Sequence, residues 1–338
     1  MHPSESMERI SGLVSVVIPA YNAEGSLRRC IESVLGQTHK FLEVIVINDG
    51  SIDGTETIAQ TYGDQIRYVY QENKGETSAR NTGFAMARGE FITFLDHDDH
   101  WHLEFVKTCV EFLHEHPEAI AVSVGSEHQT ALKDTPITTP SFLSESSAMA
   151  KSSFLIENFF EFWARHNHIC AGSAMLRGSL IDKAGGQRSD IVLSGDIEYW
   201  AYLATFGKWG FIPRVLLFVD GTQITRGNLY QKFYNRYSHC SSVENWEARV
   251  TPRLKAEDIS GFKRVRGRVA TWYIFAKVFV RRDSEAFLIA QKYKNHLEGR
   301  VGSLWRMGLI VGKLSWKFMC VLVRFRIRVQ YYLRDKKL

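Results

Sequence analysis

Apolar residues in the first third of the chain gather in short runs, separated by segments with helical spacing. Four of these runs are apolar on both faces, as in strands buried inside a parallel sheet: Val14–Pro19, Leu42–Ile47, Ile66–Tyr70 and Phe91–Leu95. The segments between them are predicted to be helices: Gly25–Gln37, Thr55–Thr61 and Thr77–Ala87. Strands that alternate with helices predict an α/β fold, with a mostly parallel central sheet flanked by helices.

The alternating pattern continues beyond residue 100. We expect further helices at Trp101–His114, Ser153–Arg165 and Ile197–Phe206, and further strands at Ala119–Val124, Ala174–Arg177 and Phe211–Val219. Residues 125–150 are polar and rich in Ser, Thr and Pro, so they are predicted to form a long loop. Beyond Asn228 the spacing is helical to the end, which predicts a domain over residues 1–225 and a helical C-terminal region over residues 226–338.

The composition is that of a folded globular protein, with 45% hydrophobic and 23% charged residues among 338. The five cysteines are scattered and form no CxxC pair, which argues against a cysteine zinc site and for a reducing compartment. The first twelve residues lack the apolar core of a signal peptide. We therefore expect a cytoplasmic protein.

Charge is distributed unevenly along the chain. From Thr251 onward there are 21 Lys+Arg and 6 Asp+Glu residues, a net charge of +15, whereas the preceding part carries −10. A basic C-terminal part predicts an anionic partner, either a membrane surface or nucleic acid. No nucleic-acid recognition motif accompanies the charge, so we expect no nucleic acid and favour a membrane.

The predicted strand Phe91–Leu95 ends abruptly on the acidic residues Asp96, Asp98 and Asp99. Carboxylates this close repel one another, and burying them unpaired is costly. A divalent cation would compensate them, because hard cations take carboxylate oxygens; the alternative is a polar turn that caps the next helix. The nearby histidines 97, 100 and 102 raise a zinc alternative, but the oxygen-rich surroundings favour Mg²⁺ or Mn²⁺.

Three predicted strands end in polar residues, and parallel strands end at the same edge of a sheet, where ligands bind. The residues at these ends are Pro19, Ala20, Tyr21 and Asn22; Asn48 and Asp49; and Asp96 and Asp98. The Asp49 carboxylate can accept the N3–H of uracil or thymine, or the N1–H of guanine, but not cytosine N3. The alternative is that Asp49 only begins the turn at Gly50.

Arg80 lies near the start of the helix that follows the third strand, so its guanidinium can reach the same edge. There it can stack on a base or contact a phosphate. The alternative is an ion pair with a neighbouring acid such as Asp49 or Asp96.

With these motifs in this order, the sequence resembles the inverting family-two glycosyltransferases, which have the glycosyltransferase-A fold. The matching segments are VSVVIPAYNAEGSLRRCIESVLGQT, VINDGSIDGT, NKGETSARNTG, ITFLDHDD and, farther on, SGDIEYWAYLATFG. The resemblance covers residues 13–220 and implies that residues 1–225 are a catalytic domain that binds a nucleotide-sugar.

The resemblance also implies a role for each matching residue. Pro19, Ala20, Tyr21 and Asn22 border the nucleotide base, Asp49 binds the base or ribose, Arg80 helps to hold the nucleotide, Asp96 contacts ribose or metal, Asp98 contacts the metal, and Asp196 is the general base. This sequence departs from the family pattern in two places: Asn48 replaces an acid, and Gly195 replaces the Glu before the base. Glu198, close to the base, is expected to be structural or to bind the acceptor.

The chemistry of the residues agrees with these roles. Mn²⁺ or Mg²⁺ stabilises the charge that develops on a leaving diphosphate. Asp196 begins a predicted helix, where the helix dipole keeps a carboxylate ionised and able to accept the proton of an acceptor hydroxyl. The alternative is that Asp196 merely caps this helix.

We therefore expect an inverting, metal-dependent glycosyltransferase of cell-surface polysaccharide biosynthesis. It would move a sugar from a nucleotide-diphosphate donor, a UDP-sugar, to a hydroxyl of a glycan or lipid-linked acceptor. The alternatives are a nucleotidyltransferase, which would keep the metal acids without needing Asp196, and a non-catalytic membrane-associated subunit that binds sugar-nucleotide or glycan.

The last residues of the chain are predicted to form one basic amphipathic helix. Its cations step by seven and four along one stripe: Arg306, Lys313, Lys317, Arg324 and Arg328. No uncharged stretch is long enough to span a bilayer, so we expect a peripheral protein whose tail lies on the inner, anionic face of the membrane. The alternative is a helix packed on its own domain or in an oligomer interface.

Overall fold

We describe the protein from a computed structural model of the chain. The structure describes residues 8–130, 133–144, 149, 151–221, 229–311 and 316–326. The chain divides into two compact units: residues 1–189 with 199–223, and residues 190–198 with 224–338.

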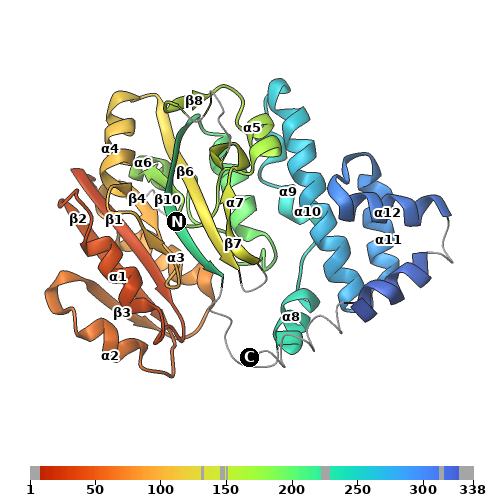
Figure 1. Cartoon of the computed structure of the whole chain (residues 1–338), viewed down its shortest axis with the longest axis horizontal. Helices are drawn as coiled ribbons and strands as arrows, with labels where there is room; N and C mark the ends of the chain where they lie inside the picture. Colours follow the sequence, from red (N-terminus) through yellow and green to blue (C-terminus); the bar gives the residue numbers. More distant parts are fainter. Residues whose placement is uncertain are drawn as a thin grey trace, which may run out of the picture. The chain divides into compact units, whose positions relative to one another are not determined.

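The first unit is built on a ten-stranded sheet with the order β3-β2-β1-β4-β9-β6-β10-β5, in which β7 also pairs with β6 and β8 with β10. Several of these strands are visible side by side in Figure 1. The strands are β1 (Ile10–Ala20), β2 (Leu42–Asp49), β3 (Arg67–Gln71), β4 (Gly89–Phe94), β5 (His100–Trp101), β6 (Ala119–Thr130), β7 (Lys133–Thr139), β8 (Phe154–Ile156), β9 (Ala174–Arg177) and β10 (Lys208–Gly221).

Strand direction changes along this sheet. The pairings β1–β2, β1–β4 and β2–β3 are parallel, as is β6–β10. β9 lies antiparallel between β4 and β6, so β4 and β6 point the same way. The carboxyl ends of β1, β2, β4, β6 and β10 therefore lie along one edge of the sheet.

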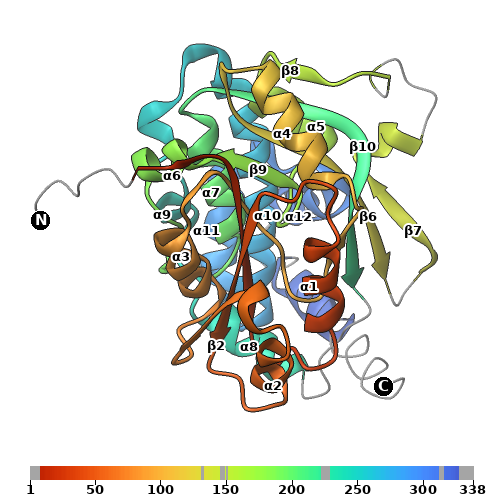
Figure 2. The same ribbon diagram turned by 90° about the vertical axis from the view of Figure 1, so that its left-hand side faces the viewer.

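Helices cover both faces of the sheet in the first unit, with α1 and α4 on one side and α3 and α6 on the other (Figure 2). The helices are α1 (Leu27–Leu35), α2 (Thr55–Gln60), α3 (Glu76–Met86), α4 (Phe105–Glu115), α5 (Phe159–His166), α6 (Gly178–Ala184) and α7 (Gly195–Ala204), whose first turn belongs to the second unit. Alternate residues of β1 serve the two faces: Val16 and Ile18 join the core with α1 and α4, and Val17 contacts Gly83 of α3.

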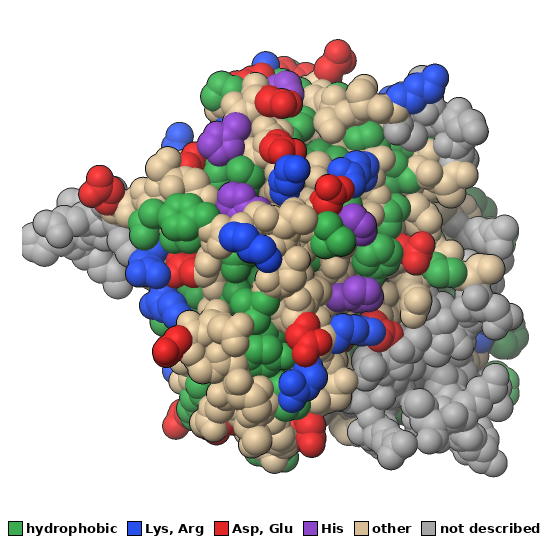
Figure 3. All heavy atoms as spheres, turned by 60° about the vertical axis from the view of Figure 1, so that its left-hand side comes forward, with side chains coloured by type: hydrophobic (Ala, Val, Ile, Leu, Met, Phe, Trp, Pro, Cys, Tyr) green, Lys and Arg blue, Asp and Glu red, His purple; other side chains and the backbone are tan. Residues whose placement is uncertain are grey.

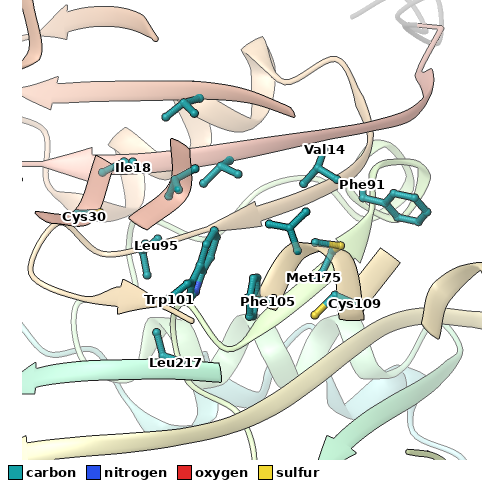
Figure 4. Close-up of a cluster of buried hydrophobic side chains, with 14 of the residues drawn as sticks. Val14, Ile18, Cys30, Phe91, Leu95, Trp101, Phe105, Cys109, Met175 and Leu217 are labelled. Atoms are coloured by element: carbon teal, nitrogen blue, oxygen red, sulfur yellow. The ribbon is translucent and has the colours of Figure 1, made fainter. Parts of the chain in front are cut away.

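The core on the α1 and α4 side is formed by side chains from three helices, α1, α2 and α4, from seven strands of the sheet and from the loop after β4. Several of these side chains are labelled in Figure 4. It includes Cys30 of α1, Leu95 after β4 and Cys109 of α4, all fully buried. The Trp101 ring stacks on the Phe105 ring with centroids 4.1 Å apart, and Trp101 Nε1 donates to the Gly172 carbonyl. This core fixes the loop between β4 and β5, which carries the acidic turn.

Three predictions of local structure were wrong. The polar segment 125–150 was predicted to be a loop, yet β6 continues to Thr130, β7 pairs with it over Lys133–Thr139, and a 3₁₀ turn follows at Ser141–Ser144. The helix predicted from Trp101 begins at Phe105, because His100 and Trp101 pair with β10. The helix predicted from Ser153 begins at Phe159, after the short strand β8.

The second unit is helical in its described part, as predicted for the C-terminal region. Its helices are α8 (Leu229–Ser238), α9 (Val243–Glu247), α10 (Ile259–Phe279), α11 (Asp283–Tyr293) and α12 (Gly299–Val311), followed by a helical stretch over residues 316–326. Within the described residues, no helix combines the length and apolar character needed to cross a membrane.

The prediction of one continuous C-terminal helix was wrong. The rings of Trp305 and Trp316 lie 5.4 Å apart, whereas eleven residues of a straight α-helix would separate them by about 16 Å. α12 and the stretch 316–326 therefore pack against each other. Of the predicted basic stripe, Arg324 instead pairs with Asp283, and Lys313 and Arg328 lie outside the described residues.

Candidate active site

Three of the sequence-predicted segments meet at the carboxyl edge of the parallel strands. β1 ends at Ala20, which lies opposite Asn48 of β2, and Val17 of β1 lies opposite Phe94, at the end of β4. The Leu95 N–H donates to the Val17 carbonyl, which leads the chain directly to Asp96. The expected gathering of the segments beginning at Ala20, Asp49 and Asp96 on one edge is therefore observed.

The turn after β1 is locked to the turn after β2. The Asn22 N–H donates to Ser51 Oγ over 2.9 Å, and Asn22 Oδ1 accepts from the Ile52 N–H over 3.0 Å. Asn22 has a φ of 49°, a left-handed conformation that Asn tolerates better than most residues. Tyr21 is 46% exposed next to it, so its ring can contact a ligand, whereas Pro19 and Ala20 are buried.

Asn48, which replaces an acid of the family pattern, uses both ends of its amide. Its Oδ1 accepts from the Ser51 N–H over 2.9 Å, and its Nδ2 donates to the Tyr68 hydroxyl over 2.8 Å. An ionised carboxylate could not make the second bond as a donor. The substitution therefore keeps the turn closed without adding a charge at this edge.

Asp49 is buried, and its carboxylate organises the loop that leads to α3. One oxygen accepts from Gln71 Nε2 over 2.7 Å and from the Lys74 N–H over 2.9 Å, and the other accepts from the Gly75 N–H over 2.8 Å. A carboxylate has about four acceptor positions, so three of them are used by the chain. The turn role considered for Asp49 is therefore present, and its contact with a base or ribose stays a prediction.

Arg80 is buried and pairs with an acid, as one of its two sequence interpretations expected. Its guanidinium donates to Asp96 Oδ1 over 2.6 Å, pairs with Glu76 one helical turn earlier, and lies over the Phe94 ring at 4.6 Å. Arg80 therefore links α3 to the acidic turn. Its contact with a nucleotide stays a prediction.

The acidic turn, residues 96–99, is held from two directions. From α1, Ser26 Oγ bonds His97 Nδ1 over 2.9 Å, and Arg29 donates to the Asp98 carbonyl over 2.7 Å. From the end of β10, the Asp220 N–H donates to Asp99 Oδ1 over 3.1 Å. Arg29 also donates to Asp220 Oδ2 over 2.8 Å, which joins the two supports.

The carboxylates of this turn and of Asp220 are crowded. Burial raises the pKa of Asp98, and the charges of Asp96 and Asp220 act in the same direction. Burial and the charges of Asp96 and Asp98 raise the pKa of Asp99 to about 8. On the face shown in Figure 3, acidic and basic side chains are interspersed.

These residues fit a hard divalent cation. Within the described ranges, no three Asp, Glu, His or Cys side chains converge to hold a metal by themselves. Mg²⁺ needs no such set, because it is usually bound by one or two carboxylates together with substrate phosphates. Asp98 is half-buried beside like charges, so a cation there would relieve their repulsion, whereas one oxygen of Asp96 is already taken by Arg80.

The three histidines of this region have separate partners. His97 bonds Ser26, the His100 ring stacks on Phe218 with centroids 5.1 Å apart, and His102 Nδ1 accepts from the Glu104 N–H. Burial lowers the pKa of His100, which favours its neutral form. Their rings therefore serve the packing of the turn and the start of α4.

Asp196 lies in the first turn of α7 and is half-buried. The segment before it is tied to the helices of the second unit: Trp246 Nε1 donates to the Ser194 carbonyl over 3.0 Å, and the Tyr273 hydroxyl donates to the Leu193 carbonyl over 3.1 Å. Ser194 has a φ of 61°, a strained conformation for Ser that these bonds hold in place.

Glu198 is structural, one of the two roles expected for it. It is fully buried, and its two oxygens accept from Arg249 Nε over 2.5 Å and from the other side of the same guanidinium over 2.7 Å. This two-point ion pair fixes α7 to the segment after α9.

Sequence reasoning missed Arg29, Asp220 and Trp246 as supports of the predicted site. The role of Arg29 could have been predicted from the sequence. Arg29 lies on α1, directly after β1, and the N-terminal end of such a helix lies at the edge of the sheet where ligands bind. The role of Trp246 could not have been predicted, because nothing in the sequence around it indicates a contact with Ser194.

Comparison with known proteins agrees with this geometry. The model of the family described as Glycosyl transferase family 2 matches residues 15–182. An uncharacterized glycosyltransferase of Rickettsia typhi is 53% identical over 89 residues, which are 26% of this chain and 28% of that protein. The chain spans less than a third of the length of the first curated relatives that it matches.

Two solved structures share the fold. TarS of S. aureus, residues 1–349 in complex with UDP, has a TM-score of 0.55 and 14% identity, covering 89% of this chain and 92% of that one. The mannosyltransferase PcManGT of Pyrobaculum calidifontis, in complex with GDP-Man and Mn²⁺, has a TM-score of 0.53 and 18% identity, covering 95% and 86%. The predicted glycosyltransferase-A fold with a helical C-terminal region is confirmed.

Proposed function

Residues 15–182 belong to glycosyl transferase family 2, and from this membership we propose that the protein transfers a sugar from a nucleotide-diphosphate donor to a hydroxyl of a glycan or glycolipid. The observation that carries the proposal is the carboxyl edge of the sheet. There the turn after β1, the buried Asp49 and the acidic turn 96–99 lie next to one another, and Arg80 joins the last two through α3. A cell-surface polysaccharide is the proposed product class.

The proposed donor is a UDP-sugar. The fourth acceptor position of the Asp49 carboxylate can take the N3–H of uracil, and the exposed Tyr21 ring can border the base. TarS is known in complex with UDP and with UDP-GlcNAc, and PcManGT with GDP-Man. Guanine also offers an N–H to a carboxylate, so a GDP-sugar is the donor to test against.

The proposed cofactor is Mn²⁺ or Mg²⁺, held by Asp98 with Asp96 beside it. When bound, the ion supplies positive charge to the diphosphate as its negative charge grows. The residues of the chain prepare this site: Arg29 fixes the backbone of Asp98, and Arg80 orients Asp96. The negative charge of the acidic turn attracts a divalent cation. Without the cation, the same charge would repel the diphosphate of the donor.

The proposed general base is Asp196. Its carboxylate accepts the proton of the acceptor hydroxyl while that oxygen forms a bond to the anomeric carbon. The bond from the anomeric carbon to the diphosphate oxygen breaks on the opposite face, and the diphosphate leaves with the electron pair. One displacement of this kind inverts the configuration.

We further propose that the protein works peripherally on the cytoplasmic face of the membrane, where a lipid-linked acceptor would be presented. The net charge of +15 from Thr251 onward supports an anionic surface as the partner. Residues 1–225 would bind donor and residues 226–338 would include the membrane contact.

Replacing Asp196 with Asn tests the catalytic proposal. We expect donor binding, measured by a thermal shift with UDP-sugars and Mn²⁺, to stay unchanged, and the transfer rate to fall by a factor of about 10²–10⁴ because the base is lost. The matched control is Asp64→Asn, at an exposed carboxylate, which should leave both unchanged.

The same experiment separates the alternative functions. A nucleotidyltransferase would keep its activity in Asp196→Asn, and a non-catalytic binding subunit would show donor binding without transfer even before substitution. Undiminished sugar transfer by Asp196→Asn would show that Asp196 is not the base.

A further inference from the structure

The stretch 316–326 has two apolar faces, and only one of them is used. Trp316 and Cys320 are buried: the Trp316 ring packs against Trp305 and Phe287, and its Nε1 donates to the Asp283 carbonyl over 3.1 Å. α12 approaches so closely that a Cβ on Gly308 would meet the Met319 side chain. The inner face of the stretch is therefore fully engaged within its own unit.

The outer face is apolar as well. Four exposed residues at positions i, i+3, i+4 and i+7 form what we call the C-terminal apolar stripe: Phe318, Val321, Leu322 and Phe325. Both phenylalanines are 66% exposed. The neighbouring α12 also exposes apolar side chains, Met307 at 60% and Ile310 at 84%. A row of exposed apolar side chains such as the stripe is uncommon on a protein that has no partner for it.

Positive charge flanks the stripe. At 100° per residue, Lys317 and Arg326 lie on opposite sides of it, and both are exposed. Between Glu298 and Asp335 the sequence contains eight Lys or Arg residues and no Asp or Glu. Arg324, which the sequence placed on the outer basic face, is withdrawn from it by its ion pair with Asp283 and its bond to the Val278 carbonyl.

We infer that the C-terminal apolar stripe inserts into the headgroup region of an anionic membrane, with Lys317 and Arg326 on the lipid phosphates. An apolar face with cations along its borders is what an interfacial helix needs. A second copy of the chain fits less well, because a two-fold contact through the stripe would bring the same cations together with no acid of this segment to pair with them.

This inference rests on the membrane part of the proposed function and changes its physical basis. The sequence predicted one long amphipathic helix with a single basic stripe, whereas in the inferred contact the apolar side chains of residues 318–325 enter the membrane and the flanking cations steer the approach. Binding should therefore persist at a salt concentration that screens the cations, although more weakly.

The test is co-sedimentation of the full chain with vesicles of phosphatidylcholine, with and without phosphatidylglycerol. Phe318→Gln with Phe325→Gln removes apolar area without adding charge, and we expect the partition coefficient to fall about tenfold or more. The matched control is Phe41→Gln, because Phe41 is 53% exposed in the first unit. Lys317→Gln with Arg326→Gln should reduce only the preference for phosphatidylglycerol.

The outcomes are distinct. Equal vesicle binding by the unsubstituted chain and the double Phe variant would overturn insertion of the stripe. A concentration-dependent dimer that the double Phe variant dissociates, without vesicle binding by either, would overturn it in favour of a second copy. Unfolding temperatures report whether the variants fold. The Asp98→Asn variant should lose sugar-transfer activity yet bind vesicles normally. Failure of the catalytic proposal can therefore be distinguished from failure of the membrane inference.

Discussion

At the residue scale, Arg29 is the group that holds the acidic turn together. Its guanidinium contacts the Asp98 carbonyl and the Asp220 carboxylate at once, although Arg29 is itself 44% exposed. Asp220 is only 8% exposed, so without Arg29 its charge would face the other carboxylates with less compensation. At the proposed metal site Arg29 would act through Asp98, as a positioning residue.

Replacing Arg29 with Met should weaken binding of donor and Mn²⁺ together. We expect the KM for the donor and the Mn²⁺ concentration for half-maximal rate to rise about tenfold, because the Asp98 backbone loses its anchor. The neighbouring Arg28→Met is the control, since Arg28 is exposed. Titration of donor and metal against initial rate measures both constants, and equal values in the two variants would contradict this role.

At the scale of elements, the best-predicted parts were those in which local pattern and tertiary packing agree. β1, β2, β4 and the helices α1 and α3 lie where apolar runs and helical spacing placed them. The loop prediction for residues 125–150 was wrong because β7, which among the described strands pairs with β6 alone, carries polar residues. An antiparallel strand at such a position has a solvated face, so its sequence looks like that of a loop.

The conformation of the segment before α7 also could not be predicted from local sequence. Its conformation at Ser194 is held by Trp246 of α9 and Tyr273 of α10, which follow it in the chain by more than fifty residues and by eighty. The first turn of α7, with Asp196, is therefore positioned by the C-terminal helices.

Replacing Trp246 with Phe removes the hydrogen bond to Ser194 and keeps most of the ring. We expect kcat to fall about tenfold with the KM for the donor unchanged, because the proposed base would be less well placed. Trp272→Phe is the control, since Trp272 is 54% exposed in the same unit. Steady-state kinetics distinguishes the two, and a rise in KM alone would show that Trp246 does not position the base.

At the scale of the whole molecule, one buried carboxylate ties the first unit together at the edge opposite the candidate site. Glu43 of β2 accepts from Ser15 of β1 over 2.7 Å, from Arg67 of β3 over 3.2 Å, and from the Arg88 N–H before β4 over 2.7 Å. Burial acts to raise the pKa of Glu43, but the bonds from Ser15 and Arg88 outweigh it and lower the pKa below its ordinary value of 4.5.

Because the pKa of Glu43 is lowered in the folded state, the protein is expected to lose stability at acidic pH. A carboxyl with a lowered pKa in the folded state adds stability above its unfolded pKa and loses it as the pH falls through the folded value. Glu43→Gln should lower the free energy of unfolding at neutral pH by about 1.5–3 kcal/mol, and its stability should depend less on pH below 4.5.

Urea unfolding across this pH range measures the effect of Glu43→Gln. The exposed Glu111→Gln on α4 is the control, and it should behave like the unsubstituted chain. If the free energy of unfolding depended on pH below 4.5 equally in all three proteins, Glu43 would not be the group that causes the loss of stability in acid.

The sequence by itself determined the alternation of strands and helices from β1 to β4 and the edge at which the polar residues after these strands meet. Those features follow from local periodicity and from the rule that parallel strands end together. Only the tertiary structure decided which side chains support that edge in the first unit and which hold the start of α7 in the second. Arg29 and Asp220, at the edge, are 191 residues apart, and Arg249 and Glu198, in the second unit, are 51 apart. No local pattern encodes such pairs, because they form only when the packed core brings distant segments within hydrogen-bond distance.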